Sequence, residues 1–325
     1  MTLSTENFLE YANKIESEVG RVIVGQGNVV RHVLISILAG GHVLLEGVPG
    51  LGKTMLIRTL GQALDLKFSR IQFTPDLMPA DIVGTEILSD ENGRREFRFR
   101  QGPLFANLVL ADEINRATPK TQSALLEAMQ EASVTVAQQT YQLEQPFFVM
   151  ATQNPLEMEG TYPLPEAQLD RFFFKVNVDL PNISEMVEIL DRTTGKESPA
   201  ANKAVSGAEI VEMRALARTV PIASHVKEYI AKLMLATHPE DANASPLVKK
   251  YVRYGVSPRG GQALVLGAKV TALMAGRYNV SFEDVHAVAK AALRHRLLLN
   301  FDGLAEGIHP DVVIDELAGM LKVTS

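Results

Sequence analysis

The sequence predicts an α/β domain with a five-stranded parallel sheet between helices, followed by a smaller, all-helical domain. Short apolar runs alternate with helical patterns up to about residue 181, and they lie at 42–47, 67–73, 107–113, 146–153 and 172–180. Strands separated by helices imply a parallel sheet that is covered on both faces. The rest of the chain has an almost wholly helical pattern.

A polar stretch without periodicity, "TTGKESPAANKAVSG" at 193–207, is typical of an exposed linker or a long loop. Beyond its start, Ser206-Gly207-Ala208-Glu209 and Ser281-Phe282-Glu283-Asp284 each have the pattern of a capping box that opens a helix. We therefore expect an α/β domain over residues 1–181 and a helical domain over 182–325.

The composition excludes several classes of protein. The formal charge is −6, from 32 basic and 38 acidic residues, so the chain lacks the global positive field of a nucleic-acid binder. The absence of cysteine excludes disulfides and thiolate metal sites, and the seven histidines show no metal-ligand spacing. The first 22 residues do not resemble a signal peptide, and no apolar run reaches the ~18–20 residues of a membrane span. We expect a soluble, cytoplasmic protein.

The segment "GVPGLGKT" at 47–54 matches the phosphate-binding pattern G-x-x-x-x-G-K-[ST]. In such a loop the backbone N–H groups point inward, the lysine adds positive charge toward the β- and γ-phosphates, and the hydroxyl offers an oxygen to Mg²⁺. A chance match in a chain of this length is on the order of one per cent, and this one lies between a predicted strand and a predicted helix, where an anion would face the helix N-terminus. We predict ATP binding, and the candidate residues are Gly47, Pro49, Gly50, Gly52, Lys53 and Thr54.

Two acids follow the third apolar run, in "LVLADE" at 108–113. At the carboxyl end of a buried strand, Asp112 would hold a magnesium-bound water and Glu113 would polarise the attacking water. A solvated turn is the commoner fate of two adjacent acids. The spacing from the phosphate loop, one strand and one helix, favours ATP hydrolysis with Mg²⁺ as the cofactor, with Thr54 and Asp112 at the metal.

The fourth run ends in "ATQNP" at 151–155, which places an amide side chain at the edge of the same site. Asn154 would orient the water or contact the γ-phosphate. A plain Asn-Pro turn explains this local pattern equally well.

Together these residues resemble the AAA+ ATPases, and more narrowly the MoxR family, over nearly the whole chain. Val24, Gly25 and Gln26 look like the amino-terminal box near adenine, "LVLADEINR" resembles Walker B, and "ATQNP" resembles the first sensor. The segment "PLPEAQLDRF" at 163–172 is similar to the one that ends in the arginine finger, here Arg171. The segment "GVSPRGGQAL" at 255–264 is similar to the second sensor, with Arg259.

The resemblance implies a ring, usually a homo-hexamer, in which Arg171 acts on the nucleotide of the neighbouring subunit. Arginine fingers contribute ~10³–10⁵ in rate. On charge alone, a salt bridge with Asp170 or another carboxylate is the usual role of such an arginine, and the alternative for Arg259 is a capping or surface arginine. Clades differ in whether the second sensor acts within its own subunit or across the ring, so this question stays open for Arg259.

Two departures from a minimal core resemble the helix-2-insert clade. Residues 81–103 interrupt the rhythm of strands and helices, with a turn at 90–93, and residues 133–145 alternate as a β-hairpin would. In this clade the insertions face the pore or the substrate. The alternative for Arg94, Arg95, Arg98 and Arg100 is a solvated edge that discourages strand pairing.

The resemblance implies an ATPase that remodels or matures partner proteins, often with a von Willebrand factor A-domain partner. Translocation of nucleic acid is a second hypothesis, which the arginine-rich insertion favours and the acidic balance disfavours. A third is a nucleotide-gated scaffold with negligible turnover, against which Glu113 argues. A small-molecule kinase is a weaker candidate, because no arginine-rich lid follows the phosphate loop at the expected place.

Overall fold

The computed structural model describes residues 3–91, 94–155, 160–195 and 199–321. Its main sheet has five parallel strands in the order β2-β5-β8-β1-β9, which confirms the predicted sheet. The strands are β1 (Val43–Glu46), β2 (Phe68–Gln72), β5 (Leu108–Asp112), β8 (Phe148–Gln153) and β9 (Phe174–Asn177). All five predicted apolar runs therefore form strands, with ends that differ by a few residues.

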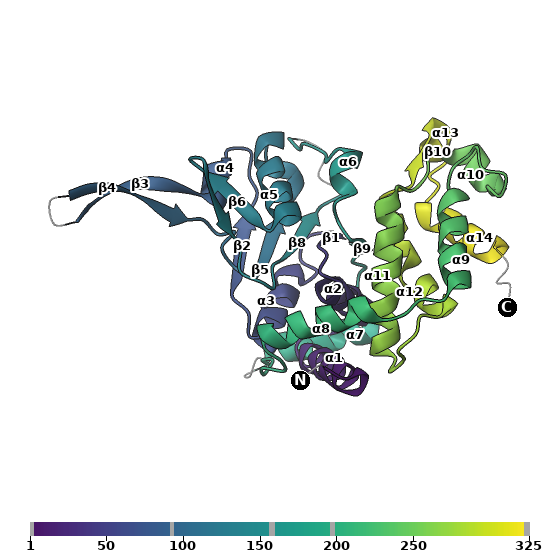
Figure 1. Cartoon of the computed structure of the whole chain (residues 1–325), viewed down its shortest axis with the longest axis horizontal. Coiled ribbons are helices and arrows are strands. Elements are labelled where there is room, and N and C mark those ends of the chain that lie inside the picture. Colours follow the sequence, from purple (N-terminus) through teal and green to yellow (C-terminus); the bar gives the residue numbers. More distant parts are fainter. Residues whose placement is uncertain (1–2, 92–93, 156–159, 196–198, 322–325) are drawn as a thin grey trace.

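Helices cover both faces of this sheet (Figure 1). Alternate strand residues point to opposite faces, so Leu45, Leu110 and Met150 pack in one core with α1, α2 and α3, while Leu44 and Val109 pack in a second core with α5. The helices of this part are α1 (Thr5–Gly20), α2 (Gly27–Ala39), α3 (Lys53–Ala63), α4 (Pro79–Val83), the 3₁₀ helix η1 (Ile114–Arg116), α5 (Pro119–Glu131), α6 (Glu166–Leu169), α7 (Ile183–Thr194) and α8 (Gly207–Thr219).

The carboxyl-terminal part is built of helices, as the sequence predicts. Both predicted capping boxes form, at the start of α8 and at the start of α12. A short antiparallel strand pair is an addition that the pattern did not indicate. The elements are α9 (Ser224–Leu235), α10 (Pro246–Tyr251), β10 (Val252–Tyr254), α11 (Pro258–Met274), α12 (Phe282–Leu293), β11 (Leu298–Leu299), α13 (Phe301–Ala305) and α14 (Pro310–Met320).

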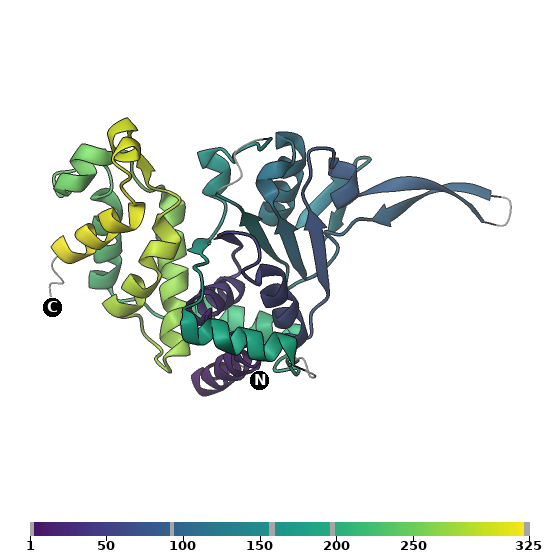
Figure 2. The ribbon, with the colours of Figure 1, turned by 180° about the vertical axis from the view of Figure 1, so that it is seen from behind.

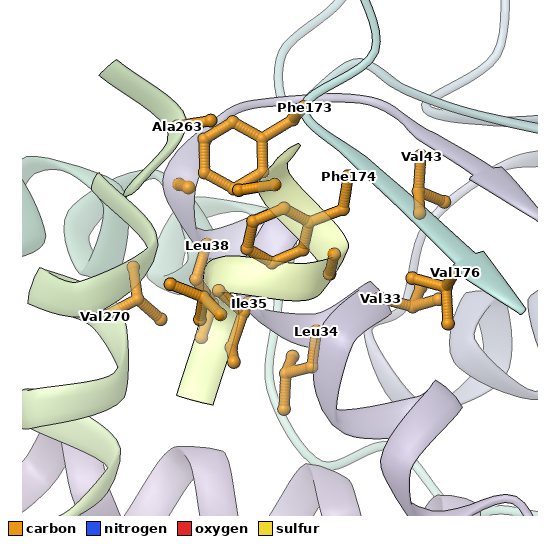
Figure 3. Packing of buried hydrophobic residues seen from close by; sticks show 14 of the residues in the cluster. Val33, Leu34, Ile35, Leu38, Val43, Phe173, Phe174, Val176, Ala263 and Val270 are labelled. Atoms are coloured by element: carbon orange, nitrogen blue, oxygen red, sulfur yellow. The ribbon is translucent and has the colours of Figure 1, made fainter. Parts of the chain in front are cut away.

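One continuous core joins the sheet to these helices. Phe173 and Phe174, at the start of β9, lie between α2 and α11 in Figure 3, beside Leu38 of α2 and Ala263 of α11. Gly267 of α11 lies so close to Phe174 that an added Cβ would be 2.9 Å from the ring. The helical part is therefore packed tightly against the edge strand of the sheet.

The predicted linker at 193–207 packs more closely than an exposed loop. Ala204 and Val205 are buried, and the Ala204 N–H donates to the carbonyl of Ala63 at 2.7 Å. Residues 196–198 lie outside the described residues. The predicted linker also overlaps two helices, since residues 193 and 194 end α7 and Gly207 begins α8, while 199–206 have an irregular conformation.

Both predicted insertions are β-hairpins. β3 (Gly84–Glu91) and β4 (Arg94–Gln101) form a long arm that projects away from the body, as Figures 1 and 2 show. β6 (Ser133–Val136) and β7 (Gln139–Gln142) form the shorter hairpin before β8. The rings of Phe99 and Tyr141 stack with centroids 4.0 Å apart and connect the two hairpins. Within the predicted turn of the long arm, Asn92 and Gly93 lie outside the described residues.

Candidate active site

The phosphate loop connects β1 to α3, as the motif predicts. Gly50 and Gly52 have φ of 86° and 75°, which favours glycine at both positions. At Gly47 a Cβ atom would be 2.8 Å from the carbonyl oxygen of Val178, so a side chain has no room there. The Lys53 ammonium, at the start of α3, donates to the Gly47 carbonyl. Burial lowers the pKa of Lys53, while Asp112, Glu113 and Glu46 act in the opposite direction.

Asp112 is the last residue of β5 and is held by two neighbours. It accepts a hydrogen bond from the Thr152 hydroxyl at 2.6 Å and one from the Arg70 guanidinium at 2.7 Å. Arg70 comes from β2, the edge strand that pairs with β5. A carboxylate at the end of a strand, facing the helix N-terminus of α3, is suited to bind a cation beside a phosphate.

Glu113 lies just beyond the strand, with a left-handed φ of 56°. Its N–H donates to the Thr152 hydroxyl at 2.8 Å. Its carboxylate accepts hydrogen bonds from Gln72 at 2.8 Å and from Arg116 at 2.9 Å. The two acids therefore point to separate sets of partners, although they are adjacent in the chain.

A cavity of about 410 Å³ brings most of the predicted site residues together. Asn154, buried one residue beyond the end of β8, lines it opposite the loop. Gly47 is absent from the lining and supports the loop from behind. The lining residues are Pro49, Gly50, Leu51, Gly52, Lys53, Thr54, Arg70, Gln72, Asp112, Glu113, Thr152 and Asn154.

A second cavity, about 250 Å³ and largely apolar, adjoins the first at Gly50, Leu51 and Gly52. Val24 and Gln26 line it, as the resemblance implies, and the Gln26 amide donates to the Leu51 carbonyl at 2.7 Å. Gly25 does not line this cavity but has a φ of 72°, which shapes the turn between its neighbours.

The opposite wall of the apolar cavity comes from α7, through Met186, Ile189 and Thr193. Arg192 of the same helix donates to the Arg21 carbonyl at 2.6 Å, which joins α7 to the end of α1. An apolar slot that opens onto a cationic loop fits a flat aromatic base joined to a chain of phosphates.

Arg171 and Arg259 lie elsewhere. Neither lines either of these two cavities, and both line a third one, about 250 Å³, with Gln130 and Gln262. Arg171 is exposed, and within the described ranges its side chain makes no ion pair. The salt bridge with Asp170, which charge alone suggested, does not form: Asp170 binds Arg296 at 2.8 Å instead, with Arg259 3.8 Å away.

Sequence reasoning missed several residues of these sites. Gln72 and Arg70 could have been found, because β2 pairs with β5 and its end must lie beside the two acids. Thr152 lies within the "ATQNP" segment and could have been included with Asn154. Arg296 has no local signal, since it follows α12 in a part of the chain without a recognisable motif.

A strand, a phosphate loop, a helix and two acids at the end of a neighbouring parallel strand define a P-loop nucleoside triphosphatase. Comparison with known proteins agrees. Residues 42–174 match the family model for the ATPase family associated with various cellular activities (AAA), and residues 244–317 match an AAA lid domain.

Individual relatives show to which family of these ATPases the chain belongs. The chaperone MoxR1 of Mycobacterium tuberculosis is 45% identical over 300 residues, 92% of this chain and 79% of that protein. Protein MoxR of Paracoccus denitrificans is 33% identical over 305 residues, 88% of each chain. A crystal structure of a candidate ATPase from Cytophaga hutchinsonii superposes with a TM-score of 0.92 at 41% identity, over 99% of this chain and 97% of that one. The chain belongs to the MoxR family of AAA+ ATPases.

Two kinds of feature are absent from the described residues. None of the helices there is long and apolar enough to cross a membrane. No group of three or more histidine, aspartate or glutamate side chains in the same part of the chain is placed to hold a metal ion by itself.

Proposed function

We propose that the protein hydrolyses ATP with Mg²⁺ in a ring of identical subunits, usually a hexamer in this family, and uses the energy to remodel or mature partner proteins. One observation carries the enzymatic part: the apolar cavity opens at Gly50–Gly52 onto the cavity where Lys53, Thr54, Asp112 and Glu113 converge. The base would occupy the first cavity and the phosphates the second.

The donor set fits Mg²⁺. The Thr54 hydroxyl and the Asp112 carboxylate supply the oxygen ligands that this ion prefers, and a triphosphate would supply others. When bound, the ion neutralises charge on the phosphates. Arg70 and Thr152 hold Asp112 in its present position, so Arg70 competes with a cation for this carboxylate.

Glu113 would act as the general base that polarises the attacking water. Its hydrogen bonds from Gln72 and Arg116 both go to Oε2, and they orient the carboxylate. Lys53 would contact the β- and γ-phosphates, and Asn154 would orient the water from the end of β8.

The position of Arg171 supports the ring. Because this arginine is exposed and lies outside the nucleotide cavities of its own chain, we place it against the γ-phosphate of a neighbouring subunit. Arg259 lines the same cavity as Arg171, which supports action across the ring for both.

We infer that the clients are proteins from the name of a relative. The relative from Mycobacterium tuberculosis is named a chaperone, and we extend that role to this chain, with a von Willebrand factor A-domain protein as a candidate partner.

We place this work in the cytoplasm, which the absence of cysteine fits. Within one subunit, we propose that residues 1–181 form the nucleotide-binding domain and residues 182–325 the lid, whose first helix, α7, adds a wall to the apolar cavity.

Steady-state ATPase assays of purified protein with Mg²⁺ test the enzymatic part. We expect the wild-type protein to hydrolyse ATP and Lys53→Ala to lose this activity. Glu113→Gln should bind ATP without hydrolysing it. Lys203→Ala is the matched control, because Lys203 forms an exposed ion pair with Asp65, just beyond the carboxyl end of α3. Wild-type protein without Mg²⁺-dependent turnover, or single-turnover rates that are equal in Glu113→Gln, would instead favour the nucleotide-gated scaffold.

One observation favours nucleic acid as the client. Arg98 and Arg100 are exposed and share one face of the projecting arm, because residues two apart in a strand point the same way. If DNA were the client, it would stimulate ATPase activity strongly and in a salt-sensitive manner. Under our proposal, titration with single- and double-stranded DNA at two salt concentrations leaves the rate unchanged. Co-purification with Glu113→Gln would then identify the protein clients.

A further inference from the structure

The Asp170 carboxylate lines the third cavity together with the two exposed arginines. It accepts hydrogen bonds from Arg296 Nε at 2.8 Å and from the Ser257 hydroxyl at 2.9 and 3.0 Å, and it forms an ion pair with Arg259 at 3.8 Å. Arg171 is the next residue of the chain. The Asp170 carboxylate therefore contacts the segment that carries Arg259. Asp170 is also the residue directly before Arg171.

Arg296 anchors this carboxylate from the lid region. Its side chain is only 3% exposed. Besides Asp170 Oδ1, the guanidinium donates to the carbonyls of Asp170 at 3.0 Å, Phe172 at 2.6 Å and Phe173 at 3.2 Å. The backbone segment on both sides of Arg171 is therefore held by one buried cation.

The same cation also sets the start of α11. An added Cβ at Gly260 would be 3.0 Å from Arg296 Cδ, so the first turn of this helix packs directly on the arginine. Ser257 is the N-cap residue of α11, yet its hydroxyl binds Asp170 and makes no capping hydrogen bond to the helix. This contact connects the matched ATPase region to the matched lid region at the residues that flank Arg171 and Arg259.

We propose that Asp170 is a positioning residue for ATP hydrolysis in the neighbouring subunit: anchored by Arg296, it fixes Arg171 and Arg259 as one two-arginine unit. Asp170 does not touch the nucleotide. Its effect would pass through the arginines, because the orientation of a charged group decides how well it stabilises a transition state. The inference rests on the proposed function, namely on hydrolysis across a subunit interface.

Subunit mixing tests this inference. Asp170→Asn keeps its own nucleotide cavity intact, whereas Glu113→Gln keeps its arginines intact but cannot hydrolyse ATP. We expect Asp170→Asn alone to lower kcat about tenfold or more, with KM for ATP near the wild-type value, because the defect lies in the neighbour's transition state. Mixing the two variants should restore turnover, since about a quarter of the interfaces in a random equimolar ring combine the intact parts.

Arg171→Ala mixed with Glu113→Gln is the matched control. Recovery with Arg171→Ala but not with Asp170→Asn would overturn the role of Asp170 and leave the cross-subunit ATPase standing. No recovery with either variant would overturn the cross-subunit function, and this inference with it. A kcat of Asp170→Asn within twofold of wild type would also overturn the role of Asp170.

Ser257→Ala is a second test, for use if Asp170→Asn does not fold. This variant keeps the buried pair of Asp170 and Arg296 and removes only the hydroxyl contact with α11. We expect a several-fold loss of kcat at constant KM, with recovery on mixing. Ser224→Ala, at the start of α9, is the control for the loss of a hydroxyl. Full turnover in Ser257→Ala would overturn the positioning of Arg259 through Asp170.

Discussion

The nucleotide cavity and the arginine face, by which we mean the cavity lined by Arg171 and Arg259, are assembled in different ways. The nucleotide cavity consists largely of a loop and strand ends, placed by the parallel sheet. The arginine face depends on side chains from distant parts of the chain, joined through Asp170 and Arg296. Backbone geometry thus builds the part that would bind the nucleotide, and a buried ion pair builds the part that would complete a neighbour's site.

The largest effect should come from the arginine face. Arg171→Lys keeps the positive charge but removes the planar guanidinium, and the rate contribution of arginine fingers leads us to expect a loss of roughly 10³-fold in kcat. Steady-state ATPase assays at saturating ATP measure it, with Arg21→Lys, in an exposed ion pair, as the control. A loss of less than threefold would show that this face plays no part in hydrolysis.

The protein should be less stable in acid because of a buried histidine that lines the arginine face. His42 lies there, buried: its Nδ1 accepts the N–H of Val149 at 3.0 Å and its Nε2 bonds the Met129 carbonyl at 2.8 Å. Burial lowers the pKa of His42 from 6.5 to about 4. The unfolded chain therefore takes up a proton more readily, and stability that is present above pH 6.5 is lost as the pH falls toward 4, by about 3 kcal/mol.

Urea unfolding at a series of pH values measures this loss. His42→Gln should be less stable near neutral pH but should lose less stability on acidification, because the proton-linked contribution of His42 is gone. His225→Gln, at an exposed position, should keep the wild-type slope. The same slope in all three proteins would contradict the role of His42.

A smaller effect is expected in the apolar part of the nucleotide cavity. Ile189→Asn places an amide where we put the base, so we expect KM for ATP to rise about tenfold with little change in kcat. Ile183→Asn is the control on the same helix, since Ile183 is 87% exposed and does not line the cavity. Equal KM values for the two variants would place the base elsewhere.

The smallest effect should follow from Arg70→Ala. Removal of this guanidinium frees Asp112 from its competing ion pair, so half-maximal ATPase should require several-fold less Mg²⁺, with kcat within about twofold. Titration of the rate with Mg²⁺ at fixed ATP measures it, and Arg31→Ala, in a partly buried ion pair between α2 and α1, is the control. An unchanged titration curve would mean that Arg70 does not compete with the cation.

The difference in construction also explains what the sequence could predict. The phosphate loop, Asp112, Glu113 and Asn154 each lie at the end of an apolar run, and the ends of parallel strands must meet at one edge of a sheet. Local pattern was therefore enough to place them together. The five strands were predictable from apolar runs and the shorter hairpin from period-two alternation, and both are local signals.

The arginine face could not be derived in this way. The resemblance supplied Arg171 and Arg259, but Arg296 lies 126 residues beyond Asp170 and belongs to no motif. Which acid pairs with which arginine is decided by packing: Asp170 pairs with Arg296, and the alternative of an ion pair between Asp170 and Arg171 does not form. The hairpin turn at Ala137-Gln138 is a further case, because both residues adopt positive φ without the glycine or asparagine that marks such turns.

The stack of Phe99 on Tyr141 has a mechanical consequence. The stack joins the projecting arm to the shorter hairpin, and the shorter hairpin leads within a few residues into β8, the strand that ends beside Asn154. We therefore expect a displacement of the arm to be felt at the phosphate cavity.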